Sequence, residues 1–548
     1  MPRRAAAALL LLMLCLGIRT QAAGGSSSIN PADLREWLQY LASDELGGRA
    51  VYTEGLGLAA AYIADHLRSW RVTPAGDNGA YLQTVRVRSV KSTSRSSLTV
   101  QVGREMRVFK DGEGVTFPKN VGVKRVVTVS RVNFAGYGLD APGAKYSDFR
   151  GHNVSGSAVV FLGLDGPKAI DAGRYRRLLG GRARSAVESA HAVASLGPAP
   201  STHRDHPPGP GGQTAPDFVT SQRLDLPISP APTGSDELFE FLFSRAPVHY
   251  DELKRRATGG EPLPFFHLDD VTLTFTLDND YQVTRTQTTQ NVVGLVEGSD
   301  RTLRSSYVAF GAHYDHVGYA DAELSADGRR PSAPGRVTAG KEEDRVWNGA
   351  DDDGSGTVTL MALARAFAEG PRPKRSLVFV WHAGEERGLL GSRFFADYPT
   401  VPLDRVVAQL NIDMIGRNRD DKASEANTVY LVGSDRISSD LHQISRDANA
   451  ALSTPMTLNY EMNDPGDLEQ VYYRSDHYSY AAKGIPIIFF TTGLHADYHA
   501  NTDEVSKIEF PKMVHIAQLI YAIGRRVADL DHAPVRDNKG PRAGTGTR

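Results

Sequence analysis

Histidine and carboxylate residues follow each of five apolar runs in the second half of the chain. They are His313 and Asp315, then Asp351, Asp352 and Asp353, then Glu385 and Glu386, then Asp413, and finally His499. Where no thiolate is present, imidazole and carboxylate groups suit zinc, manganese or cobalt at a catalytic site. Asp413 stands inside an otherwise apolar segment, where a carboxylate would be costly to bury without a cation. These residue types therefore indicate a metal centre.

Two histidines and several carboxylates are more ligands than one zinc ion needs. A pair of metal ions ~3.5–4 Å apart, bridged by one carboxylate, would use them economically and is a standard hydrolytic arrangement. Such a pair polarises a carbonyl and lowers the pKa of a bridging water towards ~7. Either Glu385 or Glu386 can bind metal while its neighbour takes the proton of the water. The residues thus favour hydrolysis at a two-metal centre.

The elements that must position these groups are short apolar strands that alternate with helical patterns from about residue 281 onward. This alternation predicts an α/β fold with a mostly parallel central sheet and helices on both faces. In open sheets of this kind, ligands bind beyond the carboxyl ends of the strands. We therefore expect the five polar groups to converge at that edge.

The N-terminus has the layout of a cleaved secretory signal, with Arg3 and Arg4 before a short apolar stretch at 5–16. At ~1.5 Å per helical residue, this stretch is too short to cross a membrane, although an N-terminal anchor is the alternative interpretation. We expect residues 1–23 to be removed and the protein to be exported, either to the periplasm or out of the cell. Cys15, the single cysteine, lies inside this segment, so the mature chain has no thiol ligand or disulfide.

The overall composition excludes several other classes of protein. The 548 residues include 62 Lys and Arg against 64 Asp and Glu, a net charge of −2, which argues against a nucleic-acid binder. No apolar run reaches about 18 residues, so we expect no stable membrane span after signal cleavage. The H-E-x-x-H, G-x-S-x-G and P-loop motifs are absent from the sequence. Serine and phosphate-cradling mechanisms therefore have no motif to support them.

Five motifs carry the candidate metal residues. They are GAHYDHVG at 311–318, NGADDDGSG at 348–356, HAGEERGLLGS at 382–392, NIDMIGR at 411–417 and YRSDHYSYAAKGIPIIFFTTGLHADYH at 473–499. In order, spacing and flanking strands they resemble the co-catalytic zinc aminopeptidase family, whose relatives include glutamate carboxypeptidases and transferrin receptors. SDELGGRA at 43–50 and TPAGDNGAYLQTV at 73–85 also resemble the N-terminal segment of exported bacterial members.

The resemblance implies a zinc exopeptidase fold, two zinc ions per chain, and a specific set of ligands. That set is His313 and Asp413 on one ion, Glu386 and His499 on the other, and Asp352 as the bridge. Spacing alone leaves His495 open as an alternative to His499, whereas the family pattern places the ligand directly after Asp-Tyr. The family pattern also implies a cis peptide bond between Asp352 and Asp353.

Further roles follow from the same resemblance. Glu385 is the implied general base, and Asp315 is expected to accept a hydrogen bond from the second ring nitrogen of His313. Tyr498 and Arg474 match positions that help to bind the scissile carbonyl and the substrate in some members. The remaining histidines of these motifs are expected to be neighbours in polar networks, and they are His316 and His477.

The sequence patterns and the resemblance together divide the chain into segments. They are a signal peptide at 1–23, the N-terminal part of the peptidase domain at 30–118, a β-rich insert at 120–280, the main peptidase domain at 283–530 and a disordered tail at 531–548. Residues 134–163 resemble the start of a protease-associated domain, although the later half of the insert departs from that pattern. A passive β-rich spacer is the alternative for this segment.

The expected activity is that of an exported di-zinc aminopeptidase acting on peptide substrates. A carboxypeptidase or dipeptidase with the same metal core is the main alternative, and the charge of the substrate pocket would distinguish them. Cyclisation of N-terminal glutamine, which uses a single zinc ion, and a non-catalytic receptor-like protein are weaker alternatives. The sequence leaves the oligomeric state and the preferred first residue open.

Overall fold

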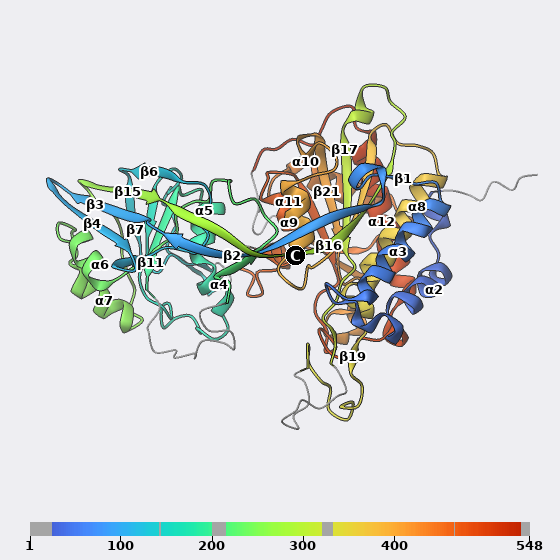
Figure 1. The fold of residues 1–548 in the computed structure, drawn as a ribbon, viewed down its shortest axis with the longest axis horizontal. Coiled ribbons are helices and arrows are strands. Elements are labelled where there is room, and N and C mark those ends of the chain that lie inside the picture. Colours follow the sequence, from blue (N-terminus) through green and yellow to red (C-terminus); the bar gives the residue numbers. More distant parts are fainter. Residues whose placement is uncertain (1–24, 142–143, 200–214, 321–332, 465, 539–548) are drawn as a thin grey trace, which may run out of the picture.

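The computed structural model describes residues 25–141, 144–199, 215–320, 333–464 and 466–538. The expected signal peptide lies outside the described residues, as does the end of the expected tail. The chain forms two units, each built around its own ten-stranded sheet (Figure 1).

The main sheet has four parallel strands at its centre, in the order β20-β17-β21-β24. They are β17 (Tyr307–His313), β20 (Ser376–His382), β21 (Val406–Ile412) and β24 (Ile487–Thr491). Antiparallel strands flank them: β16 (Asn279–Val296) pairs with β20 on one side, and β22 (Thr428–Val432) pairs with β24 on the other. The predicted α/β class with a mostly parallel central sheet is confirmed.

Alternate residues of the central strands pack on opposite faces of this sheet, because successive strand side chains point to opposite sides. In β17, Val308 and Phe310 join the core beneath five helices, whereas Ala309 joins a smaller core beneath two others. The five helices are α2 (Pro31–Leu41), α3 (Glu54–Ser69), α8 (Gly356–Glu369), α10 (Ser439–Ala450) and α12 (Phe510–Asp529). The other two are α9 (Leu390–Asp397) and α11 (His477–Ala481). Helices therefore cover both faces, as the alternation in the sequence predicts.

The second sheet runs in the order β14-β7-β10-β11-β13-β5-β4-β3-β15-β6. Its longer strands are β3 (Ser97–Val102), β4 (Glu105–Asp111), β6 (Arg125–Val129), β11 (Ala194–Pro198) and β15 (Val271–Leu277). Its shorter strands are β5 (Gly114–Thr116), β7 (Val132–Ala135), β10 (Ala158–Val160), β13 (Thr233–Gly234) and β14 (Phe265–His267). Its helices are α4 (Arg176–Gly180), α5 (Arg182–Glu188), α6 (Asp236–Leu242) and α7 (Tyr250–Thr258). β3 and β4 were expected in the peptidase domain but lie in this sheet, because β3 pairs antiparallel with both β4 and β15.

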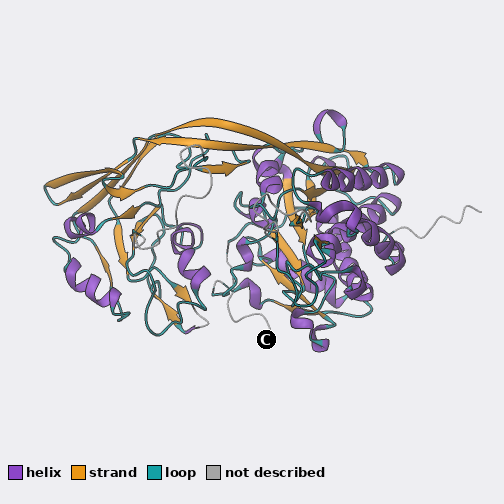
Figure 2. Ribbon diagram, turned by 60° about the horizontal axis from the view of Figure 1, so that its bottom comes forward, coloured by secondary structure: helices purple, strands orange, loops and turns teal. Residues whose placement is uncertain are grey.

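A long antiparallel ribbon connects the two units. β2 (Leu82–Ser94) pairs along its whole length with β16 (Asn279–Val296), from Leu82 opposite Val292 to Ser94 opposite Asn279. Figure 2 shows these two strands arching from one unit to the other. Among the described residues, no helix combines the length and apolarity that crossing a membrane requires.

Candidate metal centre

The five predicted metal ligands meet at one edge of the main sheet. They lie at the end of β17 (His313), before α8 (Asp352), after β20 (Glu386), after β21 (Asp413) and in the loop after β24 (His499). Because these central strands are parallel neighbours, their carboxyl ends open at the same edge. Residues up to 186 positions apart (His313 and His499) therefore converge on one site.

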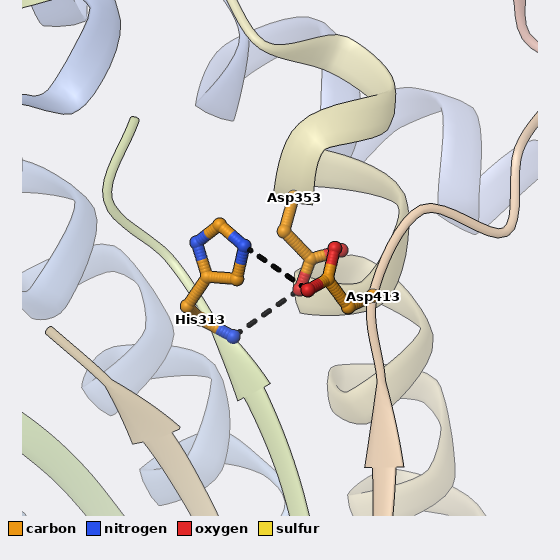
Figure 3. Close-up of side chains that lie close together, drawn as sticks. All are labelled: His313, Asp353 and Asp413. Carbon is orange, nitrogen blue, oxygen red and sulfur yellow. Dashed lines mark hydrogen bonds and ion pairs between the residues drawn. The ribbon is translucent and has the colours of Figure 1, made fainter. Parts of the chain in front are cut away.

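His313 is buried and faces two carboxylates (Figure 3). Its Nε2 lies 3.6 Å from Asp413 Oδ2, and its backbone N–H donates to Asp353 Oδ2 at 3.2 Å. Asp413 is itself held by Ser475, whose hydroxyl donates to Asp413 Oδ2 at 2.6 Å. Ser475 stands in the last motif, but nothing in its spacing from Asp413, 62 residues away, could have identified this contact.

Asp352 connects the two halves of the cluster. Its Oδ1 lies 3.3 Å from His313 Nε2, and its Oδ2 lies 3.1 Å from His499 Nε2. His499 Nε2 is also 3.0 Å from Glu386 Oε2. The peptide bond between Asp352 and Asp353 is cis, as the resemblance implies. One carboxylate thus lies between two groups, each made of one histidine and one further carboxylate.

Two residues outside the predicted ligand set also lie within this cluster. His316 Nδ1 is 3.0 Å from Glu386 Oε1 and 4.0 Å from Asp352 Oδ2, so geometry groups it with those carboxylates as a candidate ligand. Asp353 Oδ1 accepts hydrogen bonds from the N–H groups of Gly356 (2.9 Å) and Met414 (3.2 Å). The Asp353 carboxylate is thus shared among three backbone donors, which ties the turn before α8 to β17 and to the end of β21.

The alternative histidine, His495, lies elsewhere. Its Nε2 is 3.0 Å from Asp351 Oδ2, and Asp351 Oδ1 accepts a hydrogen bond from the N–H of Gly416. His477 is likewise buried outside the cluster, and its Nε2 donates to the carbonyl oxygen of Tyr472 at 2.8 Å. Of the two histidines that spacing left open, the structure therefore places His499 in the cluster.

The Asp315 carboxylate does not accept the expected hydrogen bond from the His313 ring. His313 Nδ1 is 3.0 Å from the backbone carbonyl oxygen of Asp315, whereas it is 3.8 Å from the carboxylate. The carboxylate Oδ1 instead accepts hydrogen bonds from the N–H groups of Gly384 (2.7 Å) and Glu385 (3.1 Å). The backbone already orients the His313 ring, so the Asp315 side chain is left to fix the turn that presents Glu385.

The buried histidines and carboxylates of the cluster shift one another's pKa values. Burial raises the pKa of Asp352, but His313 and His499 beside it outweigh burial and hold that pKa well below its usual value. Burial also raises the pKa of Glu385 well above its usual value, and the carboxylates of Glu386 and Asp413 add to this shift while His313 opposes it. Acids with pKa values pushed apart in one buried site are typical of functional centres.

The donor set fits metal ions. Asp352 Oδ2 and Glu386 Oε1 are buried oxygens for which the described residues supply no hydrogen bond of good geometry. Leaving ionised carboxylate oxygens buried and unpaired is costly, and cations remove that cost. Carboxylate oxygens and imidazole nitrogens without thiolate are the ligands of a catalytic zinc site. The residues present therefore fit a zinc site.

A cavity of about 510 Å³ opens beside the cluster. Asp352, Glu385, Asp413 and His499 line it on the metal side, together with Arg474 and Tyr498. Arg474 Nη2 donates to the Tyr498 hydroxyl at 3.0 Å, and the Tyr498 ring stacks on His499 with 4.1 Å between ring centres. The two residues that were expected to bind substrate therefore contact each other at the edge of the centre.

Comparison with known proteins gives one family. Residues 291–524 match the model of peptidase family M28. Leucine aminopeptidase 1 of Arthroderma otae (strain ATCC MYA-4605 / CBS 113480) is 29% identical over 228 residues, which are 39% of this chain and 52% of the relative. Leupeptin-inactivating enzyme 1 of Streptomyces exfoliatus is 31% identical over 175 residues, 31% of this chain and 35% of the relative. The chain spans about half the length of the leucine aminopeptidases that it matches.

Among solved structures, an aminopeptidase from Aneurinibacillus sp. strain AM-1 aligns with a TM-score of 0.43 and 17% identity, over 93% of this chain and 97% of that one. The match to the family model covers every residue of the candidate centre. Residues 291–524 are therefore similar to peptidase family M28.

Proposed function

We propose that the chain is a di-zinc aminopeptidase that removes the N-terminal residue of peptides. The observation that carries this proposal is the place of Asp352, with one oxygen 3.3 Å from His313 Nε2 and the other 3.1 Å from His499 Nε2. Asp413 would complete the ligands of one ion and Glu386 those of the other. When bound, zinc polarises a carbonyl and lowers the pKa of a water at the centre.

The side chains around the cavity have distinct tasks in this proposal. Glu385 takes a proton from the attacking water and passes it to the leaving amine, and the N–H contact of its backbone with Asp315 fixes its turn. Arg474 and Tyr498 would donate hydrogen bonds to the scissile carbonyl oxygen, where negative charge develops in the transition state. Both lie on the cavity wall next to Glu385, which is the arrangement that these tasks need.

The charge of the cavity favours the amino end of a peptide over the carboxyl end. Apart from the metal centre and Glu385, five carboxylates line the cavity, against two arginines. Both arginines already contact carboxylates, Arg419 with Glu461 and Arg474 with Glu469. An acidic cavity attracts a protonated α-amine and repels a terminal carboxylate. This balance supports an aminopeptidase rather than the carboxypeptidase alternative.

The proposal is tested with the purified chain, stripped of metal by a chelator and reloaded with zinc. Aminoacyl p-nitroanilides with a free amine are compared with their N-acetylated forms and with dipeptides that have a free carboxyl end. We expect zinc to restore cleavage of the free-amine anilides, and at least tenfold slower cleavage of the acetylated ones. Cleavage that requires a free carboxyl end instead would replace the proposal with a carboxypeptidase or dipeptidase.

We also propose that the protein is exported, because of the basic and apolar pattern of its first residues. Expression of the full chain in a bacterial host, followed by N-terminal sequencing of the exported product, tests this. A new N-terminus near residue 24 supports export. Full-length protein that stays with the membrane would favour the anchor.

A further inference from the structure

One segment of the cavity wall is held by the second unit. This rim segment, residues 466–475, supplies seven residues to the cavity lining. They are Gly466, Asp467, Leu468, Glu469, Val471, Arg474 and Ser475. Only a short helical turn at Val471–Tyr473 gives it regular structure, so its position depends on what packs against it.

The two short helices α4 and α5 of the second unit lie against the rim segment and the start of α11. Arg177 Nε of α4 is 3.2 Å from Glu469 Oε2. The guanidinium of Arg184 in α5 lies 4.6 Å from the centre of the Tyr473 ring, and Tyr478 donates its hydroxyl hydrogen to Glu188. These contacts join parts of the chain that are about 290 residues apart.

The apolar side of this contact is continuous with the second unit. Leu468 packs against a cluster in the second unit that contains Tyr175, Leu178 and Leu179. A residue that lines the cavity is therefore also packed against the core of the neighbouring unit. A shift of α4 would move Leu468 and its neighbour Glu469 together.

A chain of polar contacts leads from α4 to the metal centre. Glu469 Oε2 contacts both Arg177 Nε, at 3.2 Å, and Arg474 Nη1, at 2.9 Å. Arg474 Nη2 in turn donates to the Tyr498 hydroxyl, and the Tyr498 ring stacks on His499. Since Arg474 is long and flexible, its direction is set by the acceptors at its two ends.

We infer that Arg177 and Glu469 are positioning residues, through which the second unit orients Arg474 and Tyr498 for substrate. The inference rests on the proposed function, because it assigns Arg474 a contact with the substrate. Arg177 fixes the carboxylate of Glu469 from one side, so that its shared oxygen holds Arg474 on the other. The side chains of Arg177 and Glu469 are 46% and 48% exposed, so the effect should be modest and weakened by salt.

The test is a double-mutant cycle in the zinc-loaded full chain, with a leucyl p-nitroanilide as substrate. We expect Arg177→Gln to lower kcat/KM about threefold in the otherwise unchanged protein. In the Arg474→Gln background the same change should alter kcat/KM by less than about 1.5-fold, because the residue through which it acts is gone. Arg177→Lys, which keeps the charge, should restore most of the loss. Equal losses in both backgrounds would overturn the inference.

Lys254→Gln is the matched control. Lys254 Nζ pairs with Asp236 in the same unit, and their side chains are 49% and 57% exposed, but the pair lies on α6 and α7 rather than at the rim. This variant should leave kcat/KM unchanged. A threefold loss in Lys254→Gln as well would show a general effect of the second unit and would also overturn the inference.

Amide hydrogen exchange tests, without any activity measurement, whether Arg177 holds the rim segment in place. In Arg177→Gln, the peptides that cover 466–475 should exchange at least about twofold faster than in the unchanged protein, and Lys254→Gln should not alter them. Unchanged exchange in Arg177→Gln would overturn the inference. If the zinc-loaded protein cleaves no free-amine anilide, the proposed function fails, and faster exchange would still support the link from α4 to the rim.

Discussion

Arg49 lies in the unit built around the main sheet, called the peptidase unit below, and Arg182 lies in the second unit, built around the second sheet. Both are buried arginines that donate to backbone carbonyl oxygens, yet their surroundings differ. The Arg49 guanidinium donates to the carbonyls of Tyr314 (2.9 Å), Asn348 (2.7 Å) and Gly349 (2.9 Å). These carbonyls belong to the loops that carry His313 and Asp352. Burial lowers the pKa of Arg49, while several carboxylates of the candidate centre oppose that shift.

Arg182 instead closes a structural junction. It donates to the carbonyls of Leu179 (2.8 Å), Tyr137 (2.8 Å) and Gly163 (2.8 Å), and burial lowers its pKa to about 10. The two units therefore use a buried positive charge for different purposes. In the peptidase unit a buried cation braces loops that gather carboxylates for metal, and in the second unit it secures the packing of a helix on strand ends.

The largest effect should come from replacing a buried carboxylate of the peptidase unit, whereas replacing a buried carboxylate of the second unit should have little effect. Glu385→Gln should lower kcat/KM about 10³-fold with zinc content unchanged, since a glutamine cannot accept the proton of the water. Asp148 is the matched buried acid of the second unit, where burial raises its pKa to about 6 and its carboxylate accepts from Tyr137, Leu139 and Tyr146. Asp148→Asn should change kcat/KM less than about twofold. Comparable losses of activity in both variants would contradict the division of roles.

The second-largest effect should come from metal removal, to which the two units should respond differently. A ligand present at about 1,000 times its dissociation constant stabilises the state that binds it by about 4 kcal/mol. Chelation should therefore speed amide exchange in β17 and β21, which carry ligands, while β3 and β15 keep their protection. Hydrogen exchange followed by mass spectrometry measures both regions in one sample. Equal deprotection of all four strands would mean that the units unfold as one.

The two arginines themselves give the third test. Arg49→Gln should weaken zinc binding by about 10- to 100-fold, as loss of a residue that orients ligands does. Arg182→Gln should leave zinc affinity unchanged and lower the free energy of unfolding by about 2 kcal/mol, because buried carbonyls lose a charged donor. Zinc titration with a competing chelator and urea unfolding give the two quantities. Unchanged zinc affinity in Arg49→Gln would remove its link to the centre.

The smallest effect concerns pH. His477 is buried in the peptidase unit, and burial lowers its pKa to about 3. Below about pH 6.5 the His477 imidazole binds a proton in the unfolded chain but not in the native chain. The free energy of unfolding is therefore highest above that pH and decreases as the pH falls towards 3. Between pH 7 and pH 5 the loss from His477 should be about 2 kcal/mol.

Urea unfolding at pH 7 and pH 5 measures this loss, which His477→Gln should remove. If His477→Gln keeps the full loss between the two pH values, other groups are responsible.

The position of the site could be predicted because short local stretches of sequence mark it. Three of the predicted ligands lie at or near the end of an apolar strand: His313 is the last residue of β17, Asp413 directly follows β21, and Glu386 lies four residues after β20. The rule that parallel strands open at one edge then brings them together without knowledge of strand order. The contacts that fix their directions were not predictable in this way. Ser475 reaches Asp413 across 62 residues, and the Asp315 side chain binds backbone N–H groups rather than His313.

The α/β class, the resemblance to a metallopeptidase family and the residue types available to hold metal could all be read from the sequence, since alternating apolar runs and short motifs are local properties. The pairing of the strands, which places β3 and β4 in the second sheet, could be read only from the folded structure. The folded structure also decided that His316 lies beside Glu386 and that Arg177 reaches Glu469. The physical reason is that hydrogen bonds and ion pairs form between groups that packing brings within a few ångströms. When the two residues are far apart in the chain, no local sequence pattern indicates their contact.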